Sequence, residues 1–174
     1  YVDQVQSHFD HWINDIARTP GTDTNDGLGW LMQWGSNRLA ANTAFLSMVH
    51  AKDLAEDDAQ GNASRVDELR EFASDQIDNM MGDDPDGQRF VVGFGDPFPQ
   101  NPHHRAASGT TNIEDPDPNE YVLNGALVGG PLVTAGTYND DRTDFISNEV
   151  ATDYNAGFSG ALAGLYEGLE DGWM

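Results

Sequence analysis

Residues 138–156 read YNDDRTDFISNEVATDYNA and contain the clearest pattern in the chain. The first half of this stretch is a polar loop with three aspartates, and a helical pattern begins near Asn148. Apolar residues then recur on one helix face: Tyr154, Phe158, Leu162 and Leu165. We predict a closing helix over residues 148–168, with Glu149 in its first turn. A carboxyl group there is placed as rigidly as a catalytic acid requires, although a capped surface helix has the same pattern.

Three segments before this stretch have the same apolar periodicity and predict helices over residues 2–18, 37–55 and 64–81. The residues expected in the core are Val2, Val5, Phe9, Trp12, Ile13 and Ile16, then Leu39, Ala40, Ala44, Phe45, Met48 and Val49, then Val66, Leu69, Phe72, Ala73 and Ile77. The Gly- and Asp-rich residues 22–29 form an expected loop, which is not an EF-hand because no Glu closes it. Residues 82–147 lack clear periodicity, and this length suggests a functional surface built from loops. The pattern predicts an all-α barrel or bundle with its site at one rim.

The composition is strongly acidic, with 30 Asp and Glu against 8 Lys and Arg and a net charge of −22. Nucleic acid and anionic membrane surfaces are therefore excluded as partners, because few groups could neutralise phosphates. Self-repulsion of this size lowers stability unless salt screens it, so we expect either a saline environment or an acidic secreted protein.

Other sequence features bear on location. There is no run of eighteen apolar residues, which excludes a transmembrane helix, and no cysteine, which excludes disulfides and thiolate metal sites. The start at Tyr1 has no leader and suggests the middle of a longer chain. The sequon at Asn62 agrees weakly with secretion. We expect a secreted, extracellular protein.

A second constellation lies in the long loop, at Asn101-Pro102-His103-His104-Arg105. Pro102 favours extended backbone before it, and side chains two apart in extended backbone project to the same side. His103 and Arg105 would then face one site, where an imidazole and a guanidinium suit sugar hydroxyls and a carboxylate. A surface turn is the alternative. A metal site is less suited, because adjacent histidines do not easily reach one ion.

These stretches resemble the motifs of family 9 glycoside hydrolases, the endoglucanase family. The spacing aromatic-x-Asp-x4-aromatic-x3-Glu-x-Ala-x3-Asn-Ala is similar to the family's carboxy-terminal signature. The positions that fit it are Tyr138, Asp140, Phe145, Glu149, Ala151, Asn155 and Ala156. Gly95, Pro102, His103 and Arg105 resemble a second signature of the family. Trp34-Gly35-Ser36-Asn37-Arg38 is similar to a Trp-Gly-x-x-Arg motif, and residues 126–131 resemble a scaffold turn.

The resemblance implies an all-α fold, the carboxy-terminal half of an (α/α)6 barrel with long loops forming the active-site rim. Residues 1–174 would be a partial catalytic domain of an endo-β-1,4-glucanase that hydrolyses cellulose or related β-1,4-glucans with inversion. The residues implied as catalytic are Glu149 as general acid, Asp140 and His103. The residues implied as substrate-binding are Arg105, Tyr154, Trp34 and Arg38. For Trp34 and Arg38 a core position and a helix-start ion pair are the alternatives.

The family's catalytic base lies in an Asp-Ala-Gly-Asp type motif, which this sequence lacks. The resemblance therefore implies that the amino-terminal part of the same enzyme, as a second polypeptide or an unlisted segment, supplies the base and covers apolar helix faces. Without it we expect the chain to be unstable and inactive. Because the acid must be protonated at working pH, we expect other carboxylates, including Asp140, and an apolar wall around Glu149.

No cofactor is required for this chemistry and no metal is expected in the site, although structural calcium is compatible with it. Two other functions remain open: a non-catalytic carbohydrate-binding remnant of the same fold, and an acidic calcium-binding protein. His8 and His11 lie one helical turn apart, where they could bind a metal or could be exposed helix histidines.

Overall fold

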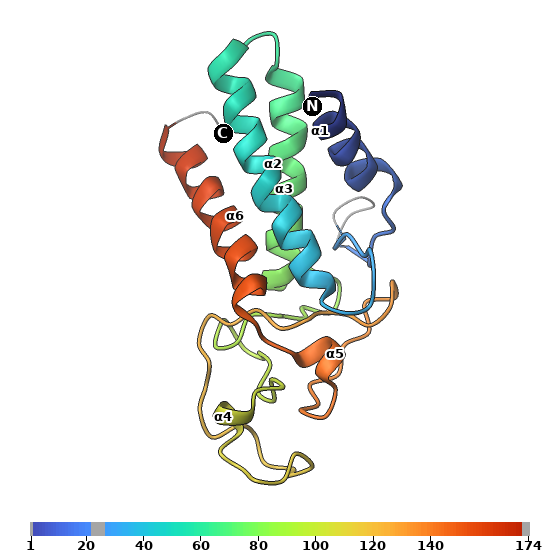
Figure 1. Ribbon diagram of the computed structural model, residues 1–174, viewed down its shortest axis with the longest axis vertical. Coiled ribbons are helices and arrows are strands. Elements are labelled where there is room, and N and C mark those ends of the chain that lie inside the picture. Colours follow the sequence, from blue (N-terminus) through green and yellow to red (C-terminus); the bar gives the residue numbers. More distant parts are fainter. Residues whose placement is uncertain (1, 22–26, 172–174) are drawn as a thin grey trace.

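The structure is a computed structural model that describes residues 2–21 and 27–171. Its helices are α1 (Val2–Asp10), the π-helix η1 (His11–Asp15), α2 (Ser36–Asp58), α3 (Ala63–Met81), α4 (Arg105–Ser108), α5 (Phe145–Asn148) and α6 (Thr152–Asp171). The long helices lie side by side at one end, and the loops with α4 and α5 form the other end (Figure 1). Isolated bridges are the only β pairings in the described residues, so the all-α prediction is confirmed.

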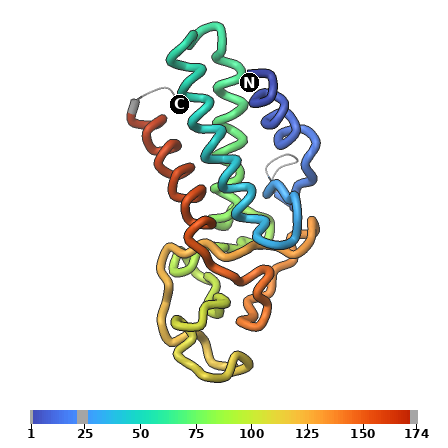
Figure 2. The backbone as a smooth tube through the Cα atoms, in the orientation of Figure 1, coloured from blue at the N-terminus to red at the C-terminus, as the bar shows by residue number. Residues whose placement is uncertain are grey.

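The backbone trace shows how the long irregular segment builds the loop end (Figure 2). Residues 82–147 are mostly irregular, as the absence of periodicity predicted, and they run beneath the long helices in Figure 1. Val91 and Val92 are buried there, and Val91 forms a bridge with Leu127. Part of the loop predicted over residues 22–29 lies outside the described residues.

Helix α2 lies between α3 and α6 and contacts both. Its fully buried apolar residues include Ala40, Ala41, Ala44 and Ala51. The prediction that Phe45 and Val49 face the core is wrong, because they are 37% and 52% exposed. Alanine is small enough to let neighbouring helix backbones approach closely, whereas larger side chains would hold them apart.

Helix α3 matches its prediction, since all five expected core residues are at most 5% exposed. The first helical segment ends at Asp15, earlier than predicted. Of its expected core residues, Phe9 and Trp12 are buried, but Val2 and Val5 are exposed. After η1 the backbone is extended at Ile16. Arg18 lies beyond the helix and donates from Nη2 to the Trp12 oxygen at 3.1 Å, which satisfies a terminal carbonyl group.

The closing helix begins at Thr152, and the prediction that it begins near Asn148 with Glu149 in its first turn is wrong. Long-range backbone pairing explains the difference. Glu149 forms a parallel bridge with His103, and Val150 forms an antiparallel bridge with Val128. These pairings require extended backbone, and Glu149 has φ −60° and ψ 141°. Glu149 therefore lies between α5 and α6.

The apolar face of α6 is largely as predicted. Tyr154 and Phe158 are 2% and 5% exposed, and Leu165 packs against the core. Leu162 is 36% exposed, while Ala161 is fully buried one position earlier. The tight approach to α2 favours the smaller residue at the contact.

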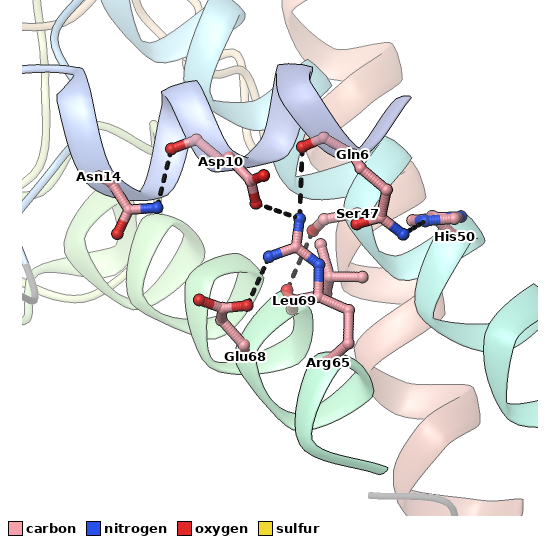
Figure 3. A network of polar contacts seen from close by, with 8 residues as sticks. All are labelled: Gln6, Asp10, Asn14, Ser47, His50, Arg65, Glu68 and Leu69. Atoms are coloured by element: carbon pink, nitrogen blue, oxygen red, sulfur yellow. Dashed lines mark hydrogen bonds and ion pairs between the residues drawn. The ribbon is translucent and has the colours of Figure 1, made fainter. Parts of the chain in front are cut away.

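A polar network attaches α1 to the other helices (Figure 3). Arg65 of α3 donates to Asp10 at 2.8 Å and to Glu68 at 2.5 Å. Gln6 Nε2 donates to His50 Nε2 of α2 at 3.3 Å. The network joins α1 to α2 and α3, and Figure 1 shows these helices on the other side of the loops from α4 and α5.

Two further observations concern membrane spans and metal ions. No helix within residues 2–21 and 27–171 is both long and apolar enough to cross a membrane. His8 and His11 are exposed on the first helical segment, and the described part of the chain has no group of three or more His, Asp or Glu placed to hold one metal ion.

Candidate active site

Glu149 lies half-buried at the α5–α6 junction, and one of its carboxylate oxygens has two donors. Oε2 accepts from Trp34 Nε1 at 3.0 Å and from the Tyr154 hydroxyl at 3.0 Å. No hydrogen bond from another described residue engages Oε1. The two donors fix the carboxyl group through one oxygen and leave the other for a ligand.

Tyr154 is a buried member of the site on the first turns of α6, and it is 2% exposed. Burial, and then the hydrogen bond to Glu149, raise the pKa of Tyr154 to about 12. The phenol is therefore protonated at neutral pH and can donate to Glu149.

Trp34 and Arg38 come from the start of α2. Trp34 is 43% exposed, so it is not a core residue. Gly35 has a φ of 67°, a left-handed conformation that turns the chain from Trp34 into the helix. Arg38 lies 5.3 Å above the Tyr154 ring and pairs with Asp153 at 3.4 Å, which is the ion pair considered from the sequence. The structure thus brings both residues to the Glu149 site.

His103 reaches this site through its backbone bridge with Glu149. Its Nδ1 lies 2.8 Å from the Arg142 main-chain oxygen. A carbonyl oxygen only accepts, so Nδ1 carries the proton and Nε2 is the acceptor of the neutral imidazole. The Phe145 ring lies 6.0 Å from the His103 ring and 5.3 Å from the Trp34 ring. A row of three rings therefore runs beside Glu149.

His103 and Arg105 both line one cavity of about 660 Å³, as does His104 between them. Arg105 begins α4 and is exposed. His104 has another task, because its Nδ1 accepts from Ala107 N at 3.1 Å and caps α4.

Both carboxylate oxygens of Asp140, which we expected to lie close to Glu149, accept hydrogen bonds from the segment before His103. Its oxygens accept from Gln100 N at 2.7 Å and Asn101 N at 2.9 Å. Asn101 Nδ2 adds a contact at 3.2 Å. The carboxylate thus anchors the segment that leads into His103.

Two supporting residues were missed by the sequence reasoning, Asn148 and Arg142. Asn148 is fully buried and donates from Nδ2 to Asn139 O at 2.7 Å and Asp141 O at 3.1 Å, while the Tyr138 hydroxyl donates to its Oδ1. Burial, and then the charges of Asp140 and Asp144, raise the pKa of Tyr138. Tyr138 and Asn148 both lie in the opening stretch, but only the fold shows that they meet.

The structure is thus a layer of helices with a held carboxyl group on its loop rim, and comparison with known proteins identifies the family. The sequence model of glycosyl hydrolase family 9 matches residues 1–162, so the chain belongs to this family. It is 45% identical over 168 residues to an endoglucanase of Dictyostelium discoideum, covering 92% of the chain and 21% of that protein. It is 39% identical to endoglucanase A of Bacillus pumilus, covering 99% of the chain and 26% of that protein.

Solved structures agree with the sequence relatives. The endoglucanase CelQ from Clostridium thermocellum superposes with a TM-score of 0.81 at 40% identity, covering 94% of this chain and 27% of that one. The endoglucanase of the termite Nasutitermes takasagoensis gives 0.78 at 43% identity, covering 94% and 36%. These likenesses confirm the fold as part of an (α/α)6 barrel. The chain spans between 21% and 36% of the length of these four relatives.

Proposed function

We propose that the chain is the carboxy-terminal part of an inverting endo-β-1,4-glucanase, with Glu149 as its general acid. The observation that carries the proposal is the pair of hydrogen bonds from Trp34 and Tyr154 to Glu149 Oε2. A carboxyl group held through one oxygen presents the other in a fixed direction, which proton transfer in a transition state requires. The cavity beside His103 and Arg105 offers polar groups for sugar hydroxyls.

The substrate class follows from the relatives. They are named endoglucanases, and CelQ was solved in complex with cellobiose and cellotriose. A β-1,4-linked glucan would lie along the loop rim. Arg105 can donate to its hydroxyls, and the exposed Trp34 ring can stack on a sugar face.

In the proposed mechanism, Glu149 donates its proton from Oε1 to the glycosidic oxygen as the bond to the anomeric carbon breaks. A water molecule attacks that carbon from the opposite face and loses a proton to a base carboxylate. In inverting enzymes the two carboxyl groups lie roughly 6.5–9.5 Å apart, which leaves room for the water. A β linkage then gives an α product.

The amino-terminal part of the enzyme would supply the base aspartate. The small share of its relatives that the chain spans supports this proposal. An exposed apolar stripe on α6 supports it too, since Leu162, Tyr166 and Leu169 are 36%, 66% and 67% exposed. The missing part would cover this stripe, and hydrolysis would require both parts.

The test is Glu149→Gln in the complete enzyme, amino-terminal part included. We expect hydrolysis of a soluble β-1,4-glucan to fall by about 10²- to 10⁴-fold, the usual contribution of general acid catalysis. Binding of cello-oligosaccharides should persist. Glu170→Gln is the matched control, because Glu170 is an exposed carboxylate at the far end of α6.

The second candidate function is a non-catalytic carbohydrate-binding remnant of the same fold. It would be supported by a complete wild-type protein that binds cello-oligosaccharides without cleaving them. Full activity of the Glu149→Gln protein would refute the acid assignment.

A further inference from the structure

Arg142 is a buried arginine at the cavity that His103 and Arg105 line. Arg142 is 5% exposed, and each nitrogen of its guanidinium group donates to an oxygen of the segment 115–119. Nε donates to Asn119 Oδ1 at 2.7 Å, Nη1 to Asp115 O at 2.9 Å and Nη2 to Asp117 O at 2.6 Å. A buried charge is tolerated when it is hydrogen-bonded this completely.

The other end of the same residue contacts the site. The main-chain oxygen of Arg142 accepts from His103 Nδ1 at 2.8 Å. Asn119 closes a second link, because its Nδ2 donates to Pro102 O at 2.9 Å. Segment 115–119 is thus connected to His103 through Arg142, and to the preceding residue Pro102 through Asn119.

Arg142 and His103 both line the cavity, together with Thr110, Thr111 and Ile113. These three residues belong to the loop that continues into segment 115–119, and we call residues 110–119 the cavity wall. The wall has internal support: Thr110 donates to Asp115 Oδ2 at 3.0 Å, and Asp117 N donates to Asp115 Oδ1 at 3.1 Å. These bonds shape the loop but do not attach it to the rest of the protein. Asn119 is also attached to the segment before His103, because its backbone N donates to Gln100 O at 3.1 Å and its Nδ2 to Pro102 O. The main-chain oxygens of Asp115 and Asp117 accept from the guanidinium of Arg142, which attaches this part of the loop.

We propose that Arg142 is a positioning residue that holds the cavity wall and fixes His103 as its Nδ1–H tautomer, so that Nε2 presents an acceptor to a sugar hydroxyl. The inference rests on the proposed function for what the cavity binds, but the positioning itself does not. Only arginine offers a planar fork with donors in three directions, so lysine would keep the charge and lose the geometry.

The first test needs no variant. Nitrogen-15 NMR of the complete wild-type enzyme, at a pH where the imidazole is neutral, reports which ring nitrogen of His103 carries the proton. The proposal predicts Nδ1–H. A dominant Nε2–H tautomer would overturn it.

The second test compares Arg142→Lys with Arg65→Lys in the complete enzyme. Arg65 is a matched control, because it also makes several hydrogen bonds but lies in the helical layer (Figure 3). For Arg142→Lys we expect proteolytic cleavage within residues 110–118 to rise about tenfold or more, since one lost hydrogen bond to a charged group shifts an opening equilibrium by at least that factor. We also expect a mixture of His103 tautomers. Arg65→Lys should change neither.

Activity gives a separate readout. A misplaced wall and imidazole should lower kcat/KM of Arg142→Lys on the order of 100-fold, at a temperature where both variants are folded. Wild-type cleavage, tautomer and kcat/KM in Arg142→Lys would refute the proposal. A wild-type enzyme that fails to hydrolyse glucans while the cleavage and tautomer changes occur would refute the proposed function and leave the positioning role intact.

Discussion

Tyr154 is the donor to Glu149 whose effect can be isolated most cleanly. Tyr154→Phe removes one oxygen and keeps the buried ring. Hydrogen bonds to charged groups contribute about 1.5–3 kcal/mol, so we expect kcat/KM of the complete enzyme to fall by roughly 10- to 100-fold. KM should change little, because the hydroxyl acts on the acid and not on the sugar. A large rise in KM with unchanged kcat would instead indicate that the hydroxyl binds substrate.

Tyr154 also predicts how stability depends on pH. Its pKa is raised to about 12 from 10.0, so the folded protein keeps a proton that the unfolded chain loses first. The stabilisation is complete below pH 10 and is lost as the pH rises to about 12. The stability advantage of wild type over Tyr154→Phe in urea unfolding should therefore shrink across this window. A constant difference from pH 8 to pH 12 would contradict the assignment.

Among the helices, α6 packs closely against α2 at glycine positions. A Cβ atom on Gly157 would lie 2.1 Å from Asn42 Oδ1 and 2.8 Å from Asn42 Cα. In an exposed helix, alanine is more stable than glycine by about 0.5–1 kcal/mol. Here the opposite sign is expected, because the backbone of α2 must move to make room.

We predict that Gly157→Ala lowers the free energy of unfolding by about 1–3 kcal/mol, the usual range for overpacking. Urea unfolding measures the change. Ser159→Ala on the exposed side of the same helix is the control, and it should be close to neutral. Equal or greater stability of Gly157→Ala would mean that the two helices are farther apart than described.

The helices and the site residues differ in how well the sequence alone predicts them. The core face of α3 follows from local periodicity alone, and His103, Arg105 and Glu149 were found by motif. The start of α6 was not predictable, because the bridges of Glu149 to His103 and Val150 to Val128 join residues far apart in the chain. Arg142 looks like a solvated loop residue for the same reason: its partners lie on a different segment.

At the scale of the whole molecule, charge is the dominant feature. Eight basic side chains cannot neutralise thirty acidic ones, and the net charge is −22. The Debye length falls from about 30 Å at 0.01 M salt to about 3 Å at 1 M, so repulsion between surface carboxylates is screened progressively.

We predict that the melting temperature rises with sodium chloride over this range, by an amount on the order of 5 °C. Melting followed by circular dichroism measures it. Sucrose is the control, because it favours the compact state by exclusion without screening charge. A flat salt curve would show that the acidic surface causes no significant self-repulsion.

The proposed activity also belongs to the whole molecule, because Glu149 would act as the acid of an inverting hydrolase that an amino-terminal part completes. The most direct measurement is proton NMR of the anomeric signals released from a soluble cello-oligosaccharide by the complete enzyme during the first turnovers. We predict that the α anomer is formed first, that Glu149→Gln forms almost none, and that the 174-residue chain alone forms none. Initial release of the β anomer, or undiminished release by Glu149→Gln, would contradict it.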